Sequence, residues 1–232
     1  MILEPLLLGA GGMIVYPPEY LARAAALARA HGVHLILDEV ATGFGRTGTM
    51  FACEQAGVSP DFLCLSKGLT SGTVPLAATL TTAEVYNTFL GDPGGGKTFF
   101  HGHTFTANPV GCAAALASLD LFEEEETVDR VARLAPRLAE GARALADLPM
   151  VGDVRGIGMV AALELVRDKG TKEPLPGNAP ALREIPREGL RHGLFLRPLG
   201  NVVYLFLPQA VTREDLDDIL DRFGATLRAV LR

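Results

Sequence analysis

The sequence contains no tryptophan, only three cysteines, and no apolar run that approaches the roughly 18 residues of a membrane helix. The cysteines, Cys53, Cys64 and Cys112, stand singly in apolar segments without C-x-x-C spacing. This pattern favours buried thiols in a reducing cytoplasm over disulfides or a metal site. The first apolar run, residues 1–13, has no basic lead and is broken by a charged residue, a proline and glycines. It does not predict a signal peptide.

Positive charge is also scarce, with 21 lysines and arginines against 27 acidic residues and a net charge of −6. No segment is strongly basic, which argues against nucleic acid as a partner. Lysine itself is rare, and the chain holds only Lys67, Lys97, Lys169 and Lys172. We therefore expect a cytoplasmic globular protein that acts on small molecules and binds neither nucleic acid nor membrane.

The first half of the chain alternates helical and strand patterns. Residues 18–31 have helical spacing of apolar residues, with a proline near the start and a glycine after the end. Short apolar runs at 33–37, 61–66 and 77–80 are typical of buried strands. This alternation predicts an α/β fold with a mainly parallel sheet. Ligands of such sheets bind beyond the carboxyl ends of the strands.

The second half is predicted to be α+β. The pattern is helical almost throughout residues 109–148, which indicates a long helix followed by a second one. Further strands are predicted at 156–164 and 202–207, separated by a helix at 180–192, and an amphipathic helix at 211–232 ends the chain. The change of pattern places a domain boundary near residue 124.

Two of the predicted strand ends carry groups of complementary chemistry, Asp38 and Lys67. A lysine in partly desolvated surroundings loses its proton more easily and can attack a carbonyl. By position alone, Lys67 could equally begin a loop, and the pair Asp38-Glu39 could cap a helix or lie on the surface. Together, a lysine and a carboxylate match pyridoxal phosphate, whose pyridine nitrogen stays protonated beside a carboxylate.

A glycine-rich segment, Gly91 to Thr98 (GDPGGGKT), fits the P-loop pattern letter for letter. A P-loop follows a strand and opens a helix, so that its backbone amides point at phosphate. Here residues 84–90 predict a helix before the segment, and residues 99–102 are a poor helix start. We interpret the segment as a surface loop and expect no nucleotide hydrolysis.

Two other groups are candidates for anion binding. The turn at His101-Gly102-His103-Thr104 has no neighbouring carboxylate or cysteine to complete a metal site, and its hydroxyl and amides suit a phosphate. Ordinary hydrogen bonds within a loop explain it about as well. Arg197, close to a predicted strand, has the fork of donors that holds a carboxylate, although a surface role is the default for an arginine.

The chain resembles the class III pyridoxal-phosphate aminotransferases in three segments: LILDEVATGFGRTG at 35–48, LSKGLT at 65–70 and HGHTFTANP at 101–109. The likeness covers essentially the whole chain. The branch that serves biotin synthesis is matched by EPLLLGAGGM at 4–13, CLSKGLTSGTVPLAATLTT at 64–82 and RPLGNVVYLFLP at 197–208. The resemblance implies a type I pyridoxal-phosphate fold and a homodimer with its active site at the subunit interface. Residues 1–124 would be the carboxyl-terminal portion of the large cofactor-binding domain, and residues 125–232 the small carboxyl-terminal domain.

The resemblance also implies roles for single residues. Lys67 would carry pyridoxal 5'-phosphate as a Schiff base, and Asp38 would pair with its pyridine nitrogen. Val40 would pack against the ring. His103 and Thr104 would lie at the phosphate, with Thr104 reaching it from the neighbouring subunit.

Substrate roles are implied as well. Gly102 would line the substrate pocket, and Arg197 would hold the carboxylate of the keto acid. The amino donor would be S-adenosylmethionine and the acceptor 8-amino-7-oxononanoate, giving 7,8-diaminononanoate. The alternatives are an ω-aminotransferase acting on ornithine, 4-aminobutyrate or a polyamine, and an inactive truncated fragment. Because the family's glycine/serine phosphate loop and stacking aromatic are missing, the chain is expected to begin inside the large domain.

Overall fold

The computed structural model describes residues 1–92 and 94–232. These residues divide into two compact units. The first unit consists of Met1–Leu6, Pro17–Phe44 and Thr49–Glu126. The second unit consists of Leu7–Tyr16, Gly45–Gly48 and Thr127–Arg232. The assignment of residues 1–124 and 125–232 to a large and a small domain of a parent enzyme remains a prediction.

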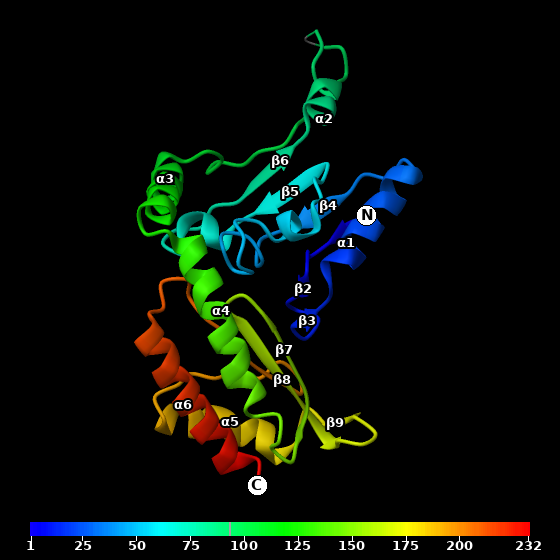
Figure 1. Ribbon diagram of the computed structural model, residues 1–232. Coiled ribbons are helices and arrows are strands. Elements are labelled where there is room, and N and C mark those ends of the chain that lie inside the picture. Colours follow the sequence, from blue (N-terminus) through cyan, green and yellow to red (C-terminus); the bar gives the residue numbers. More distant parts are fainter. Residues whose placement is uncertain (93) are drawn as a thin grey trace. The chain divides into compact units, whose positions relative to one another are not determined.

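The first unit is built on a four-stranded sheet in the order β1-β4-β5-β6 (Figure 1). Its strands are β1 (Ile2–Leu3), β4 (Ile36–Asp38), β5 (Phe62–Leu65) and β6 (Ala78–Thr81). The first three are parallel, and β6 runs antiparallel to β5. The predicted α/β architecture with a mainly parallel sheet is therefore confirmed, with one antiparallel edge.

Strand β4 begins three residues later than the apolar pattern predicts. The amide of Leu35 donates to the carboxylate Oδ2 of Asp61 at 2.7 Å, so a side chain takes the place of a strand partner. The regular pairing of β4 with β5 then starts at Ile36 opposite Phe62.

The two longer helices of the first unit begin at a proline or at a capping side chain, both of which are common helix starts. Helix α1 (Pro18–Ala30) starts on a proline, where the missing amide costs nothing. Helix α3 (Pro109–Glu124) is capped by Asn108, whose side chain accepts from the amide of Gly111 at 2.8 Å. The remaining elements are the short helix α2 (Ala83–Thr88) and the 3-10 turns η1 (Ala52–Ala56) and η2 (Lys67–Thr70).

The second unit packs three helices on an antiparallel sheet in the order β10-β8-β7, with β9 beside β8. The strands are β7 (Val151–Ile157), β8 (Val160–Asp168), β9 (Glu173–Pro174) and β10 (Val202–Phe206), and β2 (Leu7–Leu8) and β3 (Ile14–Val15) form a separate hairpin. The helices are α4 (Thr127–Arg143), α5 (Pro180–Arg191) and α6 (Arg213–Val230).

The two faces of this sheet follow the alternation of a strand. On β8, Ala161, Leu163 and Leu165 are buried in the main core with residues of all three helices. Val160 and Ala162 point to the other face, where they pack with Leu7, Met13 and Val202. Successive side chains of a strand lie on opposite faces, so β8 serves two cores at once.

The prediction of one strand at 156–164 is wrong. Residues 151–157 and 160–168 form two antiparallel strands that turn at Gly158 and Met159. Gly158 has φ +55, and a Cβ there would lie 2.1 Å from the carbonyl oxygen of Arg46. Only glycine fits this turn, because it tolerates the left-handed backbone and the close approach.

The Arg155 guanidinium explains why the β2–β3 hairpin belongs to the second unit. Its Nε and Nη2 donate to the carbonyl oxygens of Met13 and Gly12, each at 2.8 Å. Its Nη1 donates to Asp153 at 2.8 Å and to Glu164 at 2.7 Å. One largely buried cation therefore ties the hairpin to β7 and β8.

Among the described residues, no helix has both the length and the apolar character needed to cross a bilayer.

Candidate active site

Asp38 and Lys67 lie at the same edge of the first unit's sheet. Asp38 is the last residue of β4 and stands opposite Cys64 of the parallel neighbour β5. Lys67 comes three residues after Cys64, just past the end of β5. Lys67 has φ +45, in the left-handed region that a non-glycine residue seldom adopts. Such backbone strain concentrates at functional sites.

The Asp38 carboxylate is oriented by its own loop. The amide of Val40 donates to its Oδ1 at 3.0 Å. Within residues 1–92 and 94–232, the other oxygen, Oδ2, accepts no hydrogen bond from the protein. Asp38 therefore keeps one oxygen for a donor from outside the chain.

Lys67 differs from expectation in its surroundings. Its side chain is exposed rather than partly desolvated. In the described part of the chain Nζ makes no ion pair or hydrogen bond, so the amine is chemically open. The next residue, Gly68, packs against a ring: a Cβ there would lie 2.7 to 3.0 Å from side-chain atoms of Phe44. The absence of a side chain at Gly68 lets η2, which begins at Lys67, pack closely against Phe44.

Glu39 is a buried carboxylate that the sequence did not single out. Its side chain is fully buried. Oε2 accepts from Thr42 Oγ1 at 2.6 Å and from the Ala52 amide at 3.1 Å, and Oε1 accepts from the Cys53 amide at 2.9 Å. Burial raises its pKa, while the bonds from Thr42 and the two amides oppose that rise. Glu39 thus fastens the loop that follows Asp38 to the first turn of η1.

Residues 101–110 help to line a cavity next to the one that Lys67 lines. A cavity of about 760 Å³ is lined by Ser66, Val74, Pro75, Leu76, Ala77, His101, His103, Phe105, Thr106, Ala107, Asn108 and Val110. A second cavity of about 260 Å³ is lined by Lys67 and its neighbours, and it shares Ser66 and residues 74–76 with the first. The structure therefore brings His103 and Lys67 to adjoining hollows.

The hydrogen bonds of the histidine turn hold it in one shape. The amide of Phe105 donates to His103 Nδ1 at 3.1 Å, and the amide of His103 donates to Thr106 Oγ1 at 2.9 Å. The amide of His103 is therefore committed within the loop, and anion binding by the turn at residues 101–104 stays a prediction. Gly102 and Thr104 are exposed and do not line either cavity. The sequence did not single out Ser66, Thr106 or Asn108, since single polar residues in a loop give no pattern.

Arg197 belongs to the second unit. It is exposed and, within the described residues, its guanidinium forms no ion pair. Its fork of donors is open to a carboxylate from outside the chain.

The glycine-rich segment lacks the context of a P-loop. Helix α2 precedes it, and residues 97–108 form no helix, so no helix N-terminus follows Lys97. Pro93, inside the motif, lies outside the described residues.

The sheet, with a lysine and an aspartate at neighbouring strand ends, agrees with the type I fold of pyridoxal-phosphate enzymes, which the match to a solved aminotransferase shows. The family model for aminotransferase class III matches residues 1–227. The chain belongs to this family, which uses pyridoxal phosphate.

Individual members of this family are similar to the chain along almost its whole length. The chain is 50% identical over 230 residues to adenosylmethionine-8-amino-7-oxononanoate aminotransferase of Geobacter sulfurreducens, covering 99% of this chain and 51% of that protein. The crystal structure of the same kind of aminotransferase from Methanocaldococcus jannaschii superposes with a TM-score of 0.94 at 43% identity, covering 99% of this chain and 53% of that one. An (S)-enantioselective ω-transaminase from Thermomicrobium roseum gives 0.93 at 37% identity, covering 100% and 51%. The chain spans about half the length of these relatives.

Proposed function

We propose that this chain carries the catalytic lysine of a pyridoxal-phosphate-dependent aminotransferase. The observation that carries the proposal is the parallel pairing of β4 and β5, which puts Asp38 and Lys67 at one sheet edge. The residues present fit the cofactor, because one carboxylate oxygen and one amine are open there within the described part of the chain. When bound, pyridoxal phosphate supplies an electron sink for the bond that breaks at the substrate carbon.

Lys67 would hold the cofactor covalently through Nζ. Once an amino donor has taken its place, the freed Lys67 amine would take the proton from the substrate carbon and return it during transfer. Asp38 would keep the pyridine nitrogen protonated through the oxygen that Val40 leaves open. We propose that the side chain of Val40 also packs against the cofactor ring.

Binding of the phosphate and substrate would fall to the remaining predicted residues. His103 and Thr104 would contact the cofactor phosphate, with Thr104 acting across a subunit interface. Gly102 would line the substrate pocket, where a side chain would take room. Arg197 would hold the substrate carboxylate through its open fork. Its exposure and its lack of an ion pair among the described residues support this role.

The substrates proposed are S-adenosylmethionine as amino donor and 8-amino-7-oxononanoate as acceptor. The 50% identity to an aminotransferase that bears these names supports the pair. The 37% identity to an ω-transaminase supports the second candidate, transfer from ornithine, 4-aminobutyrate or a polyamine. A third reading is an inactive fragment.

Turnover assays separate these candidates. We expect the chain, supplied with pyridoxal phosphate, to develop a visible absorbance band and to convert S-adenosylmethionine and 8-amino-7-oxononanoate into 7,8-diaminononanoate, measured by mass spectrometry. Turnover of ornithine or 4-aminobutyrate, with none of the first pair, would favour the second candidate. A band without any turnover would favour the inactive fragment, and no band would refute cofactor binding by this chain.

We also propose that the chain acts as a homodimer. Large apolar side chains are exposed on α3 and on the segment before it, namely Phe100, Phe105, Val110, Leu116 and Leu121. Large apolar side chains exposed along one helix and the segment before it favour an interface. Light scattering during size-exclusion chromatography is expected to give twice the mass of the 24.6 kDa chain. A monomer at micromolar concentration would contradict this.

A further inference from the structure

A cavity in the second unit is lined mainly by arginine. It has a volume of about 630 Å³, within the range of small-molecule sites. Arg130, Arg133 and Arg137 line it from α4, and Arg213 lines it from the first residue of α6. The other lining residues are Leu134, Pro136, Glu140 and Thr212. Four arginines and one glutamate therefore line this cavity, in a chain whose net charge is −6.

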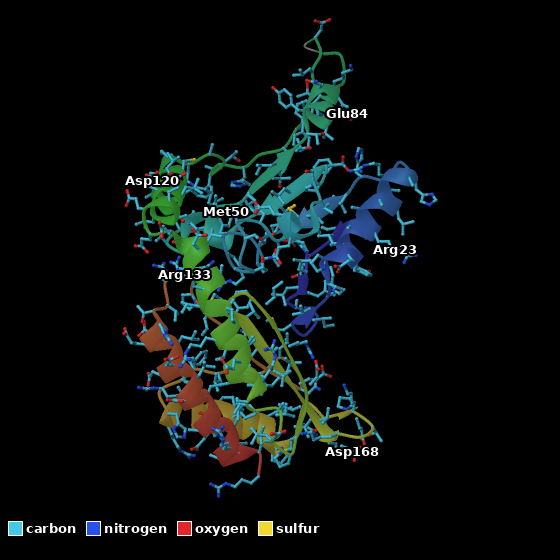
Figure 2. All side chains as sticks on the ribbon, viewed as in Figure 1. Arg23, Met50, Glu84, Asp120, Arg133 and Asp168 are labelled. Atoms are coloured by element: carbon cyan, nitrogen blue, oxygen red, sulfur yellow. The ribbon has the colours of Figure 1, made fainter. Side chains whose placement is uncertain are left out.

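The arginines of α4 share one side of the helix because of their spacing. Residues 130, 133 and 137 are three and four positions apart, and such positions are neighbours on a helix surface. Figure 2 shows Arg133 on α4. All residues of the site belong to the second unit, and none of them is among the residues proposed to hold pyridoxal phosphate.

Two of the arginines are held in place by the protein. The Nε of Arg137 donates to the carboxylate of Asp217, and Arg137, followed more weakly by Arg213, lowers the pKa of Asp217. The Nε of Arg130 donates to the carbonyl oxygen of Gln209 at 3.3 Å. Anchoring through Nε fixes the plane of each guanidinium, so less entropy is lost when a ligand binds.

The other two arginines are open to a ligand. Arg133 and Arg213 are exposed, and in the part of the chain that the structure describes neither forms an ion pair. They come from different helices, α4 and α6, so an anion with several charged oxygens can engage both. Planar guanidinium groups bind phosphoryl oxygens in pairs. Leu134 and Pro136 add an apolar wall for an organic group.

We propose that this cavity binds a small diphosphate, either the free anion or the diphosphate group of a nucleotide. Calorimetric titration of the 232-residue chain with inorganic diphosphate at constant ionic strength tests it, with ADP as a second ligand. Tighter binding of ADP than of diphosphate would identify a nucleotide as the source, and the reverse would identify the free anion.

Variants test which residues are responsible. The double variant Arg133→Ala/Arg213→Ala is expected to lose about tenfold or more in affinity. The control, Arg23→Ala/Arg29→Ala, removes the same charge from exposed positions on α1 and is expected to bind like the wild type (Arg23 is marked in Figure 2). Arg133→Lys/Arg213→Lys keeps the charge but loses the fork, and is expected to bind more weakly than the wild type.

Three results would overturn the proposal. The wild type could show no saturable binding of either ligand. The control could lose as much affinity as Arg133→Ala/Arg213→Ala, which would mean that only net charge matters. Sulfate at the same ionic strength could compete as well as diphosphate, which would mean that the site does not recognise two adjacent phosphoryl groups. The midpoint of thermal unfolding of each variant is expected to match that of the wild type, because the substituted residues are exposed.

Discussion

Lys67→Ala is expected to reduce aminotransferase turnover by roughly 10³-fold or more, because it removes both the covalent attachment and the proton-transfer group. Alanine at this position would also have φ near +45, as Lys67 has, so the change removes the amine without relieving the backbone. The measurements are the initial rate with saturating amino donor and the visible absorbance after pyridoxal phosphate is added. Both are expected to be lost together.

Lys97→Ala is the matched control for this prediction. Lys97 is exposed in the same unit and belongs to the glycine-rich loop, which lacks the context of a P-loop. It is expected to keep turnover within about twofold of wild type, since surface substitutions have small effects. If Lys67→Ala kept its rate, or if Lys97→Ala lost as much, the assignment of the catalytic lysine would be wrong.

The positions of Asp38 and Lys67 could be predicted because they depend on short stretches of sequence next to each residue. Asp38 and Lys67 each follow a short apolar run, and parallel strands bring their carboxyl ends to one edge. The run itself predicts the strand, and the strand predicts the position of the residue after it. No knowledge of distant contacts is needed for that step.

Other features depend on partners far away along the chain. The turn at Gly158 is evident from the antiparallel pairing of β7 with β8 and not from the sequence. The apolar run at residues 156–164 is compatible either with one strand or with part of a hairpin. The place of residues 7–16 in the second unit depends on Arg155, more than 140 residues further on. The exposure of Lys67 is likewise not predicted by sequence spacing, since burial depends on which other segments pack around the residue.

Glu39 is another such residue. Its acceptors are used by amides at positions 52 and 53, so its role depends on how the loop folds back. The alternation of a strand did indicate that Glu39 could be buried. Neighbouring residues of a strand point to opposite faces of the sheet, so Asp38 and Glu39 point in opposite directions, and Glu39 is the buried one of the two.

Glu39→Gln is expected to lower the free energy of unfolding by about 3 kcal/mol at pH 7, although it is nearly isosteric. Glutamine replaces one acceptor oxygen by an NH2 donor. If that donor occupies the place of Oε1 it faces the amide of Cys53, and if it occupies the place of Oε2 it faces the amide of Ala52. Either way two buried donors meet with no acceptor between them. Urea unfolding of the purified chain measures the loss.

Glu54→Gln is the control, since Glu54 is exposed in η1, to which Glu39 binds, and accepts a bond from the amide of Phe51 at 3.3 Å. Its loss is expected to stay below about 1 kcal/mol, as for other exposed capping groups. Equal losses for the two variants would show that burial of Glu39 adds nothing to its contribution.

The pH dependence of the Glu39→Gln effect follows from the direction of the pKa shift. Burial raises the pKa of Glu39, and the bonds from Thr42 and from the amides of Cys53 and Ala52 offset this only in part. The folded chain therefore binds this proton more tightly than the unfolded chain. The resulting stability is full below the unfolded pKa and is lost as pH rises through the folded pKa.

Because glutamine does not titrate, the stability advantage of the wild type over Glu39→Gln is expected to be largest at the acid end of this window. The advantage is expected to shrink as pH rises through the window, while Glu54→Gln runs parallel to the wild type. Urea unfolding of all three chains at a series of pH values measures these differences. An advantage that grows with pH would mean that the three hydrogen bonds to the ionised carboxylate outweigh its burial.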